Sequence, residues 1–556
     1  KEVLGVNQEL YLGALAYHYE RAKRTDKELT YTLLNAEHAQ AIFANAEACQ
    51  HYTHALALLD RIKTDRAIHI QHDEWLRQRF RILMGRRKIH YLLAQFDRMK
   101  RDAKELLTLV RELRDEPEML IDALLQQPGV GDYQNQLEIE AGIPLAQEAL
   151  ALSREVGDRG RELQSLISMV NQRLILSDPS WQPLAEEALE LARESGEHYF
   201  EARLLVGLGG IYAFGDQPER GMEYVEAAAA LAMSQGMEDR VVQMALLNLL
   251  GLEFERNGDY LRLLTEYQQE RLHASREIGH RPMESQALQA CGRITGIYLG
   301  DHAAALDTLD ACQSILEGSP DIIYSLFHVA QIEIAQADLE GAHETLKRID
   351  SLNAVIQDRG QASLLLVKVM LCNAEGVRAA TKSDADGVVS CLTEVLELCS
   401  DVVSLANTST LVSRQYEMAA HCQATVAHLG LAQSIPGEAE THLTAALTSA
   451  EQAHAIYQTF GFAQIVECVS EEVLLRYSQA LAANQQHDLA LRYLRRAYDE
   501  MMRKYAFIPT DSHFRRTYLE QIPLHREIRA AYSSRIGSLL ADAGQGWPQT
   551  EPAVLP

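Results

Sequence analysis

Apolar residues recur three and four positions apart along most of the chain, which is the spacing of side chains on one face of an α-helix. The clearest block spans residues 247–267 and reads as two helices joined by a turn. Its members are Leu247, Leu250, Gly251 and Phe254 on a first helix, the break Gly258-Asp259, and Leu263 and Tyr267 on a second helix. Since one such hairpin cannot bury its own apolar face, the pattern predicts stacked neighbours.

The same offsets recur within residues 205–228, 326–346 and 474–497. A second marker is the glycine expected to end each second helix, at Gly157, Gly196, Gly236 and Gly279, with spacings of 39, 40 and 43 residues. Glycine suits the left-handed position that terminates helices. Runs that alternate between polar and β-branched apolar residues are scarce, so we expect an all-α fold built from repeats of about 40 residues.

The order Leu–Gly–Phe–Gly-Asp-Tyr in residues 250–260 resembles the tetratricopeptide (TPR) repeat. The longer period and the Ala192-Arg-Glu-Ser-Gly196 hinge resemble the repeat arrays of bacterial STAND-class signalling ATPases, such as maltotriose-responsive activators and cyclase-linked ATPases. Residues 16–48 and 514–528 are similar to segments that open and close those arrays. The resemblance spans roughly residues 8–533 and implies a TPR-like α-solenoid, a right-handed superhelix of helix–turn–helix repeats.

Breaks in the periodicity suggest the domain organisation. A loop around Pro128-Gly129 separates an N-terminal helical segment with the first atypical repeats (1–127) from a regular superhelix (128–540), and residues 541–556 are expected to be a disordered tail. A solenoid can exceed the usual size of one core because each repeat packs on its neighbours. The chain begins at Lys1 without Met, and we expect it to be a fragment that follows an ATPase domain of the same polypeptide.

Charge and composition narrow the partners. The net charge of −26 disfavours nucleic acid as a partner, and no apolar run reaches the ~18 residues of a membrane span. The eight cysteines form no Cys-x-x-Cys pair, which favours buried free thiols in a reducing, cytoplasmic compartment.

Motifs for catalysis are missing from the sequence. There is no Gly-Lys dipeptide for a phosphate loop and no Gly-x-Ser-x-Gly, and Lys347 stands where a zinc-protease helix starting at His343-Glu344 needs its second histidine. His51 and His54 lie one helical turn apart, but ordinary surface histidines explain them better than a metal site does. We therefore expect no catalysis, no cofactor and no metal in this chain.

One stretch departs from the acidic background. Residues 61–104 hold 13 positive and five negative side chains. Such a patch can meet an anionic ligand or an acidic domain, with a solvated helix face as the alternative. The candidate residues are Arg79, Arg86, Arg87 and Lys88.

The repeat geometry indicates a better place for function. First helices of stacked repeats line the concave side of a superhelix, so residues one past each packing position should face the groove. These are Asn248, Glu255, Phe327, Gln331 and Gln479. The resemblance implies that a protein, peptide or small-molecule effector binds there and signals to the ATPase domain. The alternative is a constitutive protein-interaction scaffold.

Overall fold

The computed structural model describes residues 11–64, 70–113, 115–130, 136–176, 178–237, 239–317, 319, 321–352, 358–409, 412–461 and 468–542. Of the tail predicted from residue 541, the first two residues end the last helix, and 543–556 lie outside the described residues.

The described residues form helices and no β-strand. The N-terminal part contains α1 (Leu12–Arg21), α2 (Thr25–Ala41), α3 (Asn45–Thr64), α4 (His72–Leu92), α5 (Phe96–Glu112), α6 (Pro117–Leu125) and α7 (Gln136–Val156). The middle contains α8 (Arg159–Ile175), α9 (Trp181–Ser195), α10 (His198–Phe214), α11 (Pro218–Ser234), α12 (Arg240–Asn257), α13 (Tyr260–Arg262), η2 (Leu263–Gln268), α14 (Gln269–Glu277), α15 (Arg281–Arg293), η3 (Ile294–Tyr298), α16 (His302–Ile315), α17 (Ile322–Ala335) and α18 (Leu339–Ser351). The C-terminal part contains α19 (Asp358–Thr381), α20 (Ala385–Thr408), α21 (Arg414–Ser434), η4 (Pro436–Glu438), α22 (Ala439–Thr459), α23 (Ser470–Ala483), α24 (His487–Ala506), α25 (Phe514–Glu520) and α26 (Pro523–Asp542).

These helices stack as hairpins, which confirms the all-α solenoid. The first helices α8, α10, α12, α15 and α17 begin 39, 42, 41 and 41 residues apart, as the period of about 40 predicts. The next hairpins are longer than predicted, because α19, α21 and α23 begin 56 residues apart. The extra length lies in helices of 24 and 21 residues, so the C-terminal repeats are extended rather than interrupted.

The predicted helix-ending glycines adopt the conformation that the sequence argument requires. Gly157, Gly196, Gly236 and Gly279 have φ values of 77°, 69°, 59° and 62°, the left-handed region in which a Cβ is disfavoured. The next helix begins within two to four residues of each glycine, so this turn sets the repeat boundary.

The hairpin of α12 contains both an expected and an unexpected feature. A Cβ on Gly251 would lie 2.8 Å from Leu263 Cδ1, so glycine at this position permits the close approach of the second helix. That second helix, however, contains a π-helical turn, η2, between α13 and α14. A further π-helical turn, η3, follows α15. Such turns accommodate inserted residues and are frequent at functional sites.

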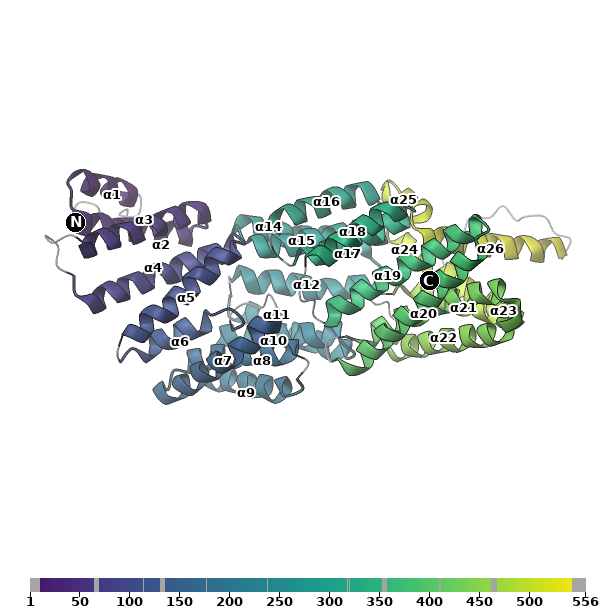
Figure 1. Ribbon diagram of the computed structural model, residues 1–556, viewed down its shortest axis with the longest axis horizontal. Coiled ribbons are helices and arrows are strands. Elements are labelled where there is room, and N and C mark those ends of the chain that lie inside the picture. The colour runs from purple at the N-terminus through teal and green to yellow at the C-terminus, as the bar shows by residue number, and fades with distance from the viewer. Residues whose placement is uncertain are drawn as a thin grey trace.

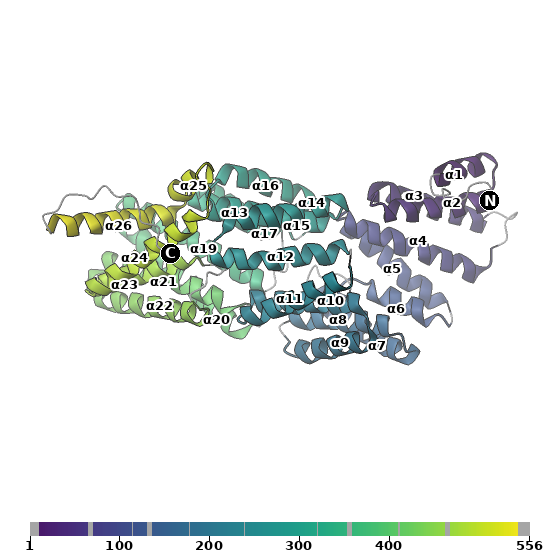
Figure 2. The ribbon, with the colours of Figure 1, turned by 180° about the vertical axis from the view of Figure 1, so that it is seen from behind.

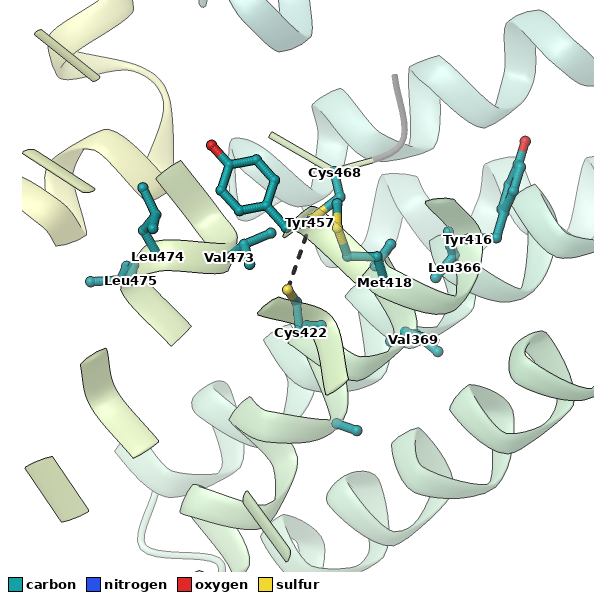
Figure 3. Close-up of a cluster of buried hydrophobic side chains, with 14 of the residues drawn as sticks. Leu366, Val369, Tyr416, Met418, Cys422, Tyr457, Cys468, Val473, Leu474 and Leu475 are labelled. Atoms are coloured by element: carbon teal, nitrogen blue, oxygen red, sulfur yellow. Dashed lines mark hydrogen bonds between the residues drawn. The ribbon is translucent and has the colours of Figure 1, made fainter. Parts of the chain in front are cut away.

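Buried cysteines contribute to the core as small apolar residues. Figure 3 shows Cys422 and Cys468 among Tyr457, Met418 and Val473, with their Sγ atoms 3.9 Å apart. Burial raises the pKa of the Cys312 thiol to about 12. All eight cysteines are free in the structure.

The two helices of each hairpin form two different walls. Among the described residues, most consecutive first helices pack directly on one another, from α8–α10 and α10–α12 through α15–α17 to α21–α23. No two consecutive second helices, such as α9 and α11 or α20 and α22, make comparable contact. The first helices therefore lie at the smaller radius, and we call the surface that they form the inner wall.

Successive coils of the superhelix also touch each other. Figures 1 and 2 show α12 in the middle of an elongated molecule, with α10 and α11 on one side and α14–α17 on the other. Hydrogen bonds join residues that are 198–246 positions apart: Asn45 Nδ2 to Ile278 O (2.9 Å), Arg414 N to Asp216 Oδ1 (2.9 Å), Arg503 Nη1 to Asn257 O (2.8 Å) and Thr517 Oγ1 to Leu299 O (2.6 Å). The expectation that each repeat packs only on its neighbours is therefore incomplete. We call these contacts the inter-coil contacts.

Candidate functional site on the inner wall

A buried ion pair lies at the centre of the inner wall. Glu255 on α12 accepts hydrogen bonds from Arg293 at the end of α15, with Oε1–Nη1 and Oε2–Nη2 distances of 2.5 and 3.1 Å. The hydroxyl of Tyr298, on η3, donates to the same carboxylate at 2.8 Å. Burial alone raises the pKa of Glu255, but the charge and hydrogen bonds of Arg293 outweigh it, and the net pKa is lowered. Glu255 is therefore a carboxylate whose charge is matched inside the fold.

The next first helix extends this polar cluster. His328 on α17 contacts Gln331 one turn later, with an Nδ1–Oε1 distance of 3.1 Å. Burial and the nearby Arg293 charge lower the pKa of His328 to about 4, so this imidazole is neutral near pH 7. A neutral imidazole and an amide provide donors and acceptors without adding net charge.

A buried arginine, Arg271, differs from Arg293. Arg271 on α14 is 5% exposed, and its guanidinium reaches between α12 and α15. Nη1 donates to Asn248 Oδ1 at 3.0 Å and Nη2 donates to Gln286 Oε1 at 2.8 Å, while Gln268 Oε1 lies 3.4 Å from Nη1. Among the described residues Arg271 forms no ion pair, and its Nε has no acceptor. Burial lowers the pKa of Arg271 to about 10.

A polar ladder crosses the inner wall of the extended C-terminal repeats. Asn373 on α19 donates to Gln423 on α21, which donates to Glu472 on α23, at 2.9 and 2.8 Å. Further along the wall, Arg476 and Gln479 on α23 both donate to Glu527 on α26, at 2.7 and 2.6 Å. The ladder consists of side chains from four helices, α19, α21, α23 and α26: Asn373, Gln423, Glu472, Arg476, Gln479 and Glu527.

The five groove candidates all map to first helices of this wall. Asn248, Gln331 and Gln479 are partly buried and belong to the hydrogen-bonded groups just described. Contrary to the prediction that they face a groove, Glu255 and Phe327 are only 2% and 3% exposed. Arg293 and Tyr298 cover the Glu255 carboxylate, and Phe327 belongs to a buried apolar cluster. Whether any of the five binds a ligand stays a prediction.

Several cations of the basic stretch are paired within the fold. Arg79 pairs with Asp60 and Glu105, and Arg86 pairs with Asp102. Arg87 is buried, with Nε 3.1 Å from Gln126 O, whereas Lys88 is exposed. Arg66 lies outside the described residues. The net charge counted along the sequence therefore overstates the field at this surface, because acidic residues from outside the stretch lie against it.

A cavity of about 640 Å³ lies on the N-terminal part, away from the central cluster. Cys49, Gln50 and Thr53 of α3 form one side, and Gln95, which precedes α5, and Arg98 on α5 form the other. Arg98 is exposed, and none of the four basic candidates lines this cavity.

Arg271 is the functional candidate that sequence reasoning missed, although the sequence contains a signal for it. Eight positions before each helix-ending glycine the repeats carry Ala149, Ala188 and Ala228, all fully buried, whereas the fourth repeat carries Arg271. The second helix of that repeat runs over 18 residues (260–277), against 17 in α11 (218–234). The π-helical turn accommodates the added residue. Aligning the repeats from their glycines would have identified an arginine at an alanine position.

Within the described residues, no helix has the length and apolar character needed to cross a bilayer. In the same part of the chain, no group of three or more His, Cys, Asp or Glu side chains is arranged to hold a metal ion.

The fold places the chain in the class of TPR-like helical-repeat proteins. No protein-family model matches the chain, and no curated protein matches it by sequence. Among solved structures it is similar to yeast Tom70 (13% identity, 96% of this chain and 98% of that chain, TM-score 0.31) and to the human IFIT1 dimer with m7Gppp-AAAA (13%, 88% and 96%, 0.36). It is also similar to the APC/C Cut9–Hcn1 hetero-tetramer (10%, 98% and 97%, 0.34). At these identities and TM-scores, the likeness defines neither a family nor a function for this chain.

Proposed function

We propose that this chain is the effector-binding arm of a STAND-class signalling ATPase, that it receives a protein, peptide or small molecule on its inner wall, and that it performs no catalysis itself. The polar wall carries the proposal. Hydrogen-bonding side chains follow one another across α12, α15 and α17, and again from α19 to α26. Partly buried polar groups of this kind give a surface directional specificity that an apolar wall lacks.

The coupling step follows from the shape of the array. A ligand shifts an equilibrium only through different affinities for two conformations. In a solenoid, small rotations between repeats add along its length, and here the inter-coil contacts define a closed state in which they are formed. A ligand that fits the wall better when those contacts are broken favours the open arm.

The proposal can be tested with variants on the two walls. Gln331→Arg and Gln479→Arg place a bulky charge on the inner wall, and Gln182→Arg on α9 is the matched change at an exposed outer position. We expect the two inner variants to weaken capture of a co-purifying partner by at least tenfold, and the outer variant to leave it unchanged. Equal binding by all three variants would contradict an inner-wall site.

The signalling part of the proposal needs the longer polypeptide. We expect deletion of residues 130–540 to change its ATPase rate or its assembly. The alternative function, a constitutive scaffold, is favoured by the same polar wall. It predicts a partner that binds equally in every nucleotide state, so partner affinity measured with ATP and with ADP distinguishes the two functions.

A further inference from the structure

Arg271 is a buried cation without a counter-charge. Its three hydrogen-bond contacts are all with neutral amide oxygens, of Asn248, Gln268 and Gln286, and its Nε–H has no acceptor among the described residues. Burying an ionised group is costly unless it is paired. The repeat itself does not need an arginine here, because Ala149, Ala188 and Ala228 occupy the equivalent position. The cost of burying Arg271 is therefore not explained by packing.

The surroundings of Arg271 place its guanidinium at the inner wall. It originates on a second helix, but its head is held by Asn248 of α12 and Gln286 of α15, which are consecutive first helices. Unlike the neighbouring pairs of first helices, α12 and α15 do not pack closely on each other. Gln286 is exposed and Asn248 is partly buried, so these two amides cover the guanidinium on the side of the inner wall. A ligand on the wall needs to displace only side chains to reach it.

We propose that Arg271 is an anion site that binds one carboxylate group of a ligand on the inner wall. Arg293 shows the completed form of such a site, since both of its Nη atoms hold the Glu255 carboxylate at 2.5 and 3.1 Å. At Arg271 two amide oxygens occupy the corresponding donors, at 3.0 and 2.8 Å. A carboxylate replaces them with charge-assisted, two-pronged hydrogen bonds, which are roughly twice as strong as neutral ones.

The charge balance selects a singly charged group. Arg271 supplies one positive charge, and the chain as a whole carries −26. A polyanion would gain one pairing and meet repulsion from the rest of the surface. A carboxylate can come from a small organic acid or from the C-terminus of a peptide. Both present the same planar group with one negative charge.

The test measures the thermal stability of the whole chain with defined probes. Sodium formate and sodium propionate are compared with sodium chloride at equal ionic strength, and an alanine hexapeptide with a free C-terminus is compared with its amidated form. We expect carboxylates to raise the melting temperature above the chloride value by several degrees at saturating concentration, because a ligand that binds only the folded state stabilises it. Stabilisation by the free peptide alone would identify a chain terminus as the source and still supports the site.

Three variants separate an anion site from a structural role. Arg271→Met removes the charge and should abolish the carboxylate effect without lowering the melting temperature in chloride. Arg271→Lys keeps the charge but removes the pair of parallel N–H donors that can hold both oxygens of a carboxylate. The apparent carboxylate affinity should therefore fall at least tenfold. Arg262→Met, at an exposed arginine on the same hairpin, is the matched control and should behave as wild type.

Two results would overturn the inference. One is a wild-type melting temperature that responds equally to chloride, formate, propionate and both peptides. The other is an Arg271→Met chain that melts well below wild type in chloride, because Arg271 would then be a structural residue. If that variant does not fold, hydrogen exchange of wild type at residues 268–286 decides, and protection unchanged by formate counts against the site.

The inference rests on the proposed function for its biological meaning, yet the two fail separately. Carboxylate stabilisation that depends on Arg271 can be present while deletion of residues 130–540 leaves the longer polypeptide unaffected. Conversely, a partner can bind the inner wall while formate has no effect.

Discussion

Two arginines in adjacent repeats, Arg271 and the partly buried Arg293, reach the same wall and differ in the groups that hold them. Arg293 reaches a carboxylate of its own chain, Glu255, and a tyrosine hydroxyl completes the group. Arg271 reaches only amides. Both lie next to π-helical turns, η3 and η2. The difference shows how a structural polar group is distinguished from a candidate binding group: the first is complete within the fold, and the second is stabilised only partly by groups that a ligand can replace.

The largest effect is expected when the carboxylate is removed from the Arg293–Glu255 ion pair. Glu255→Leu leaves Arg293, whose side chain is only 17% exposed, without its counter-charge, so we expect a loss of about 3–5 kcal/mol in the free energy of unfolding. Urea unfolding followed by far-ultraviolet circular dichroism measures it. The double variant Glu255→Leu/Arg293→Met should recover most of the loss, and a double variant as unstable as the single one would show that the pair is not the cause.

The next effect is a dependence on pH through His328. Its pKa of about 4 in the folded chain lies below the ordinary 6.5, so between these values the unfolded chain binds a proton that the folded chain does not. Stability should therefore fall as the pH is lowered from 6.5 to 4, by about 2–3 kcal/mol for this group. His328→Gln should remove that part of the pH dependence while the remaining histidines keep theirs. Identical pH profiles for the variant and wild type would contradict the assignment.

A smaller effect on stability is expected when Arg271, which has no counter-charge, is replaced. Arg271→Met replaces an uncompensated buried charge with an apolar chain of similar length, so we expect stability within about 1 kcal/mol of wild type or above it. Comparing its urea midpoint with that of Glu255→Leu tests the contrast between the two sites directly. If Arg271→Met and Glu255→Leu destabilised the chain equally, the proposed difference between the two arginines would be contradicted.

The smallest effect is expected from removing the amide of Gln286, which accepts a hydrogen bond from Arg271. Gln286→Ala removes one neutral, exposed hydrogen-bond acceptor, and we expect a loss of about 0.5 kcal/mol. Because that amide competes with a carboxylate for Nη2, the same variant should respond to lower formate concentrations than wild type does. Thermal denaturation across a formate series measures both, and a weaker response would argue against Gln286 as a displaceable cover.

Local rules predicted the repeat architecture well. The left-handed glycines at Gly157 and Gly196, and the close approach at Gly251, depend on residues near in sequence, and the structure confirms them. The inner-wall rule found Asn248, but it could not find the partner of that side chain, because Arg271 reaches across from a second helix. The length of the C-terminal repeats was also missed, since longer helices keep the same apolar spacing.

The basic stretch shows a related limit of reasoning from sequence. Arg79 lies among other cations in the sequence, yet its neighbours in space are Asp60 and Glu105. The net charge of a sequence window does not give the electrostatic potential at the folded surface, because acidic residues of adjacent helices also contribute to it. Ion pairs between adjacent helices therefore reduce the net charge that the sequence alone suggests for this stretch.

The inter-coil contacts have a mechanical consequence. A helical spring whose coils are held together does not lengthen gradually under tension. Pulling on residues 12 and 535 should therefore give little extension until links such as Asn45–Ile278 and Arg503–Asn257 rupture, after which the array becomes compliant. A force applied at one end would thus be transmitted to the other end with little extension while the inter-coil contacts hold. The array would extend under that force only after those contacts rupture.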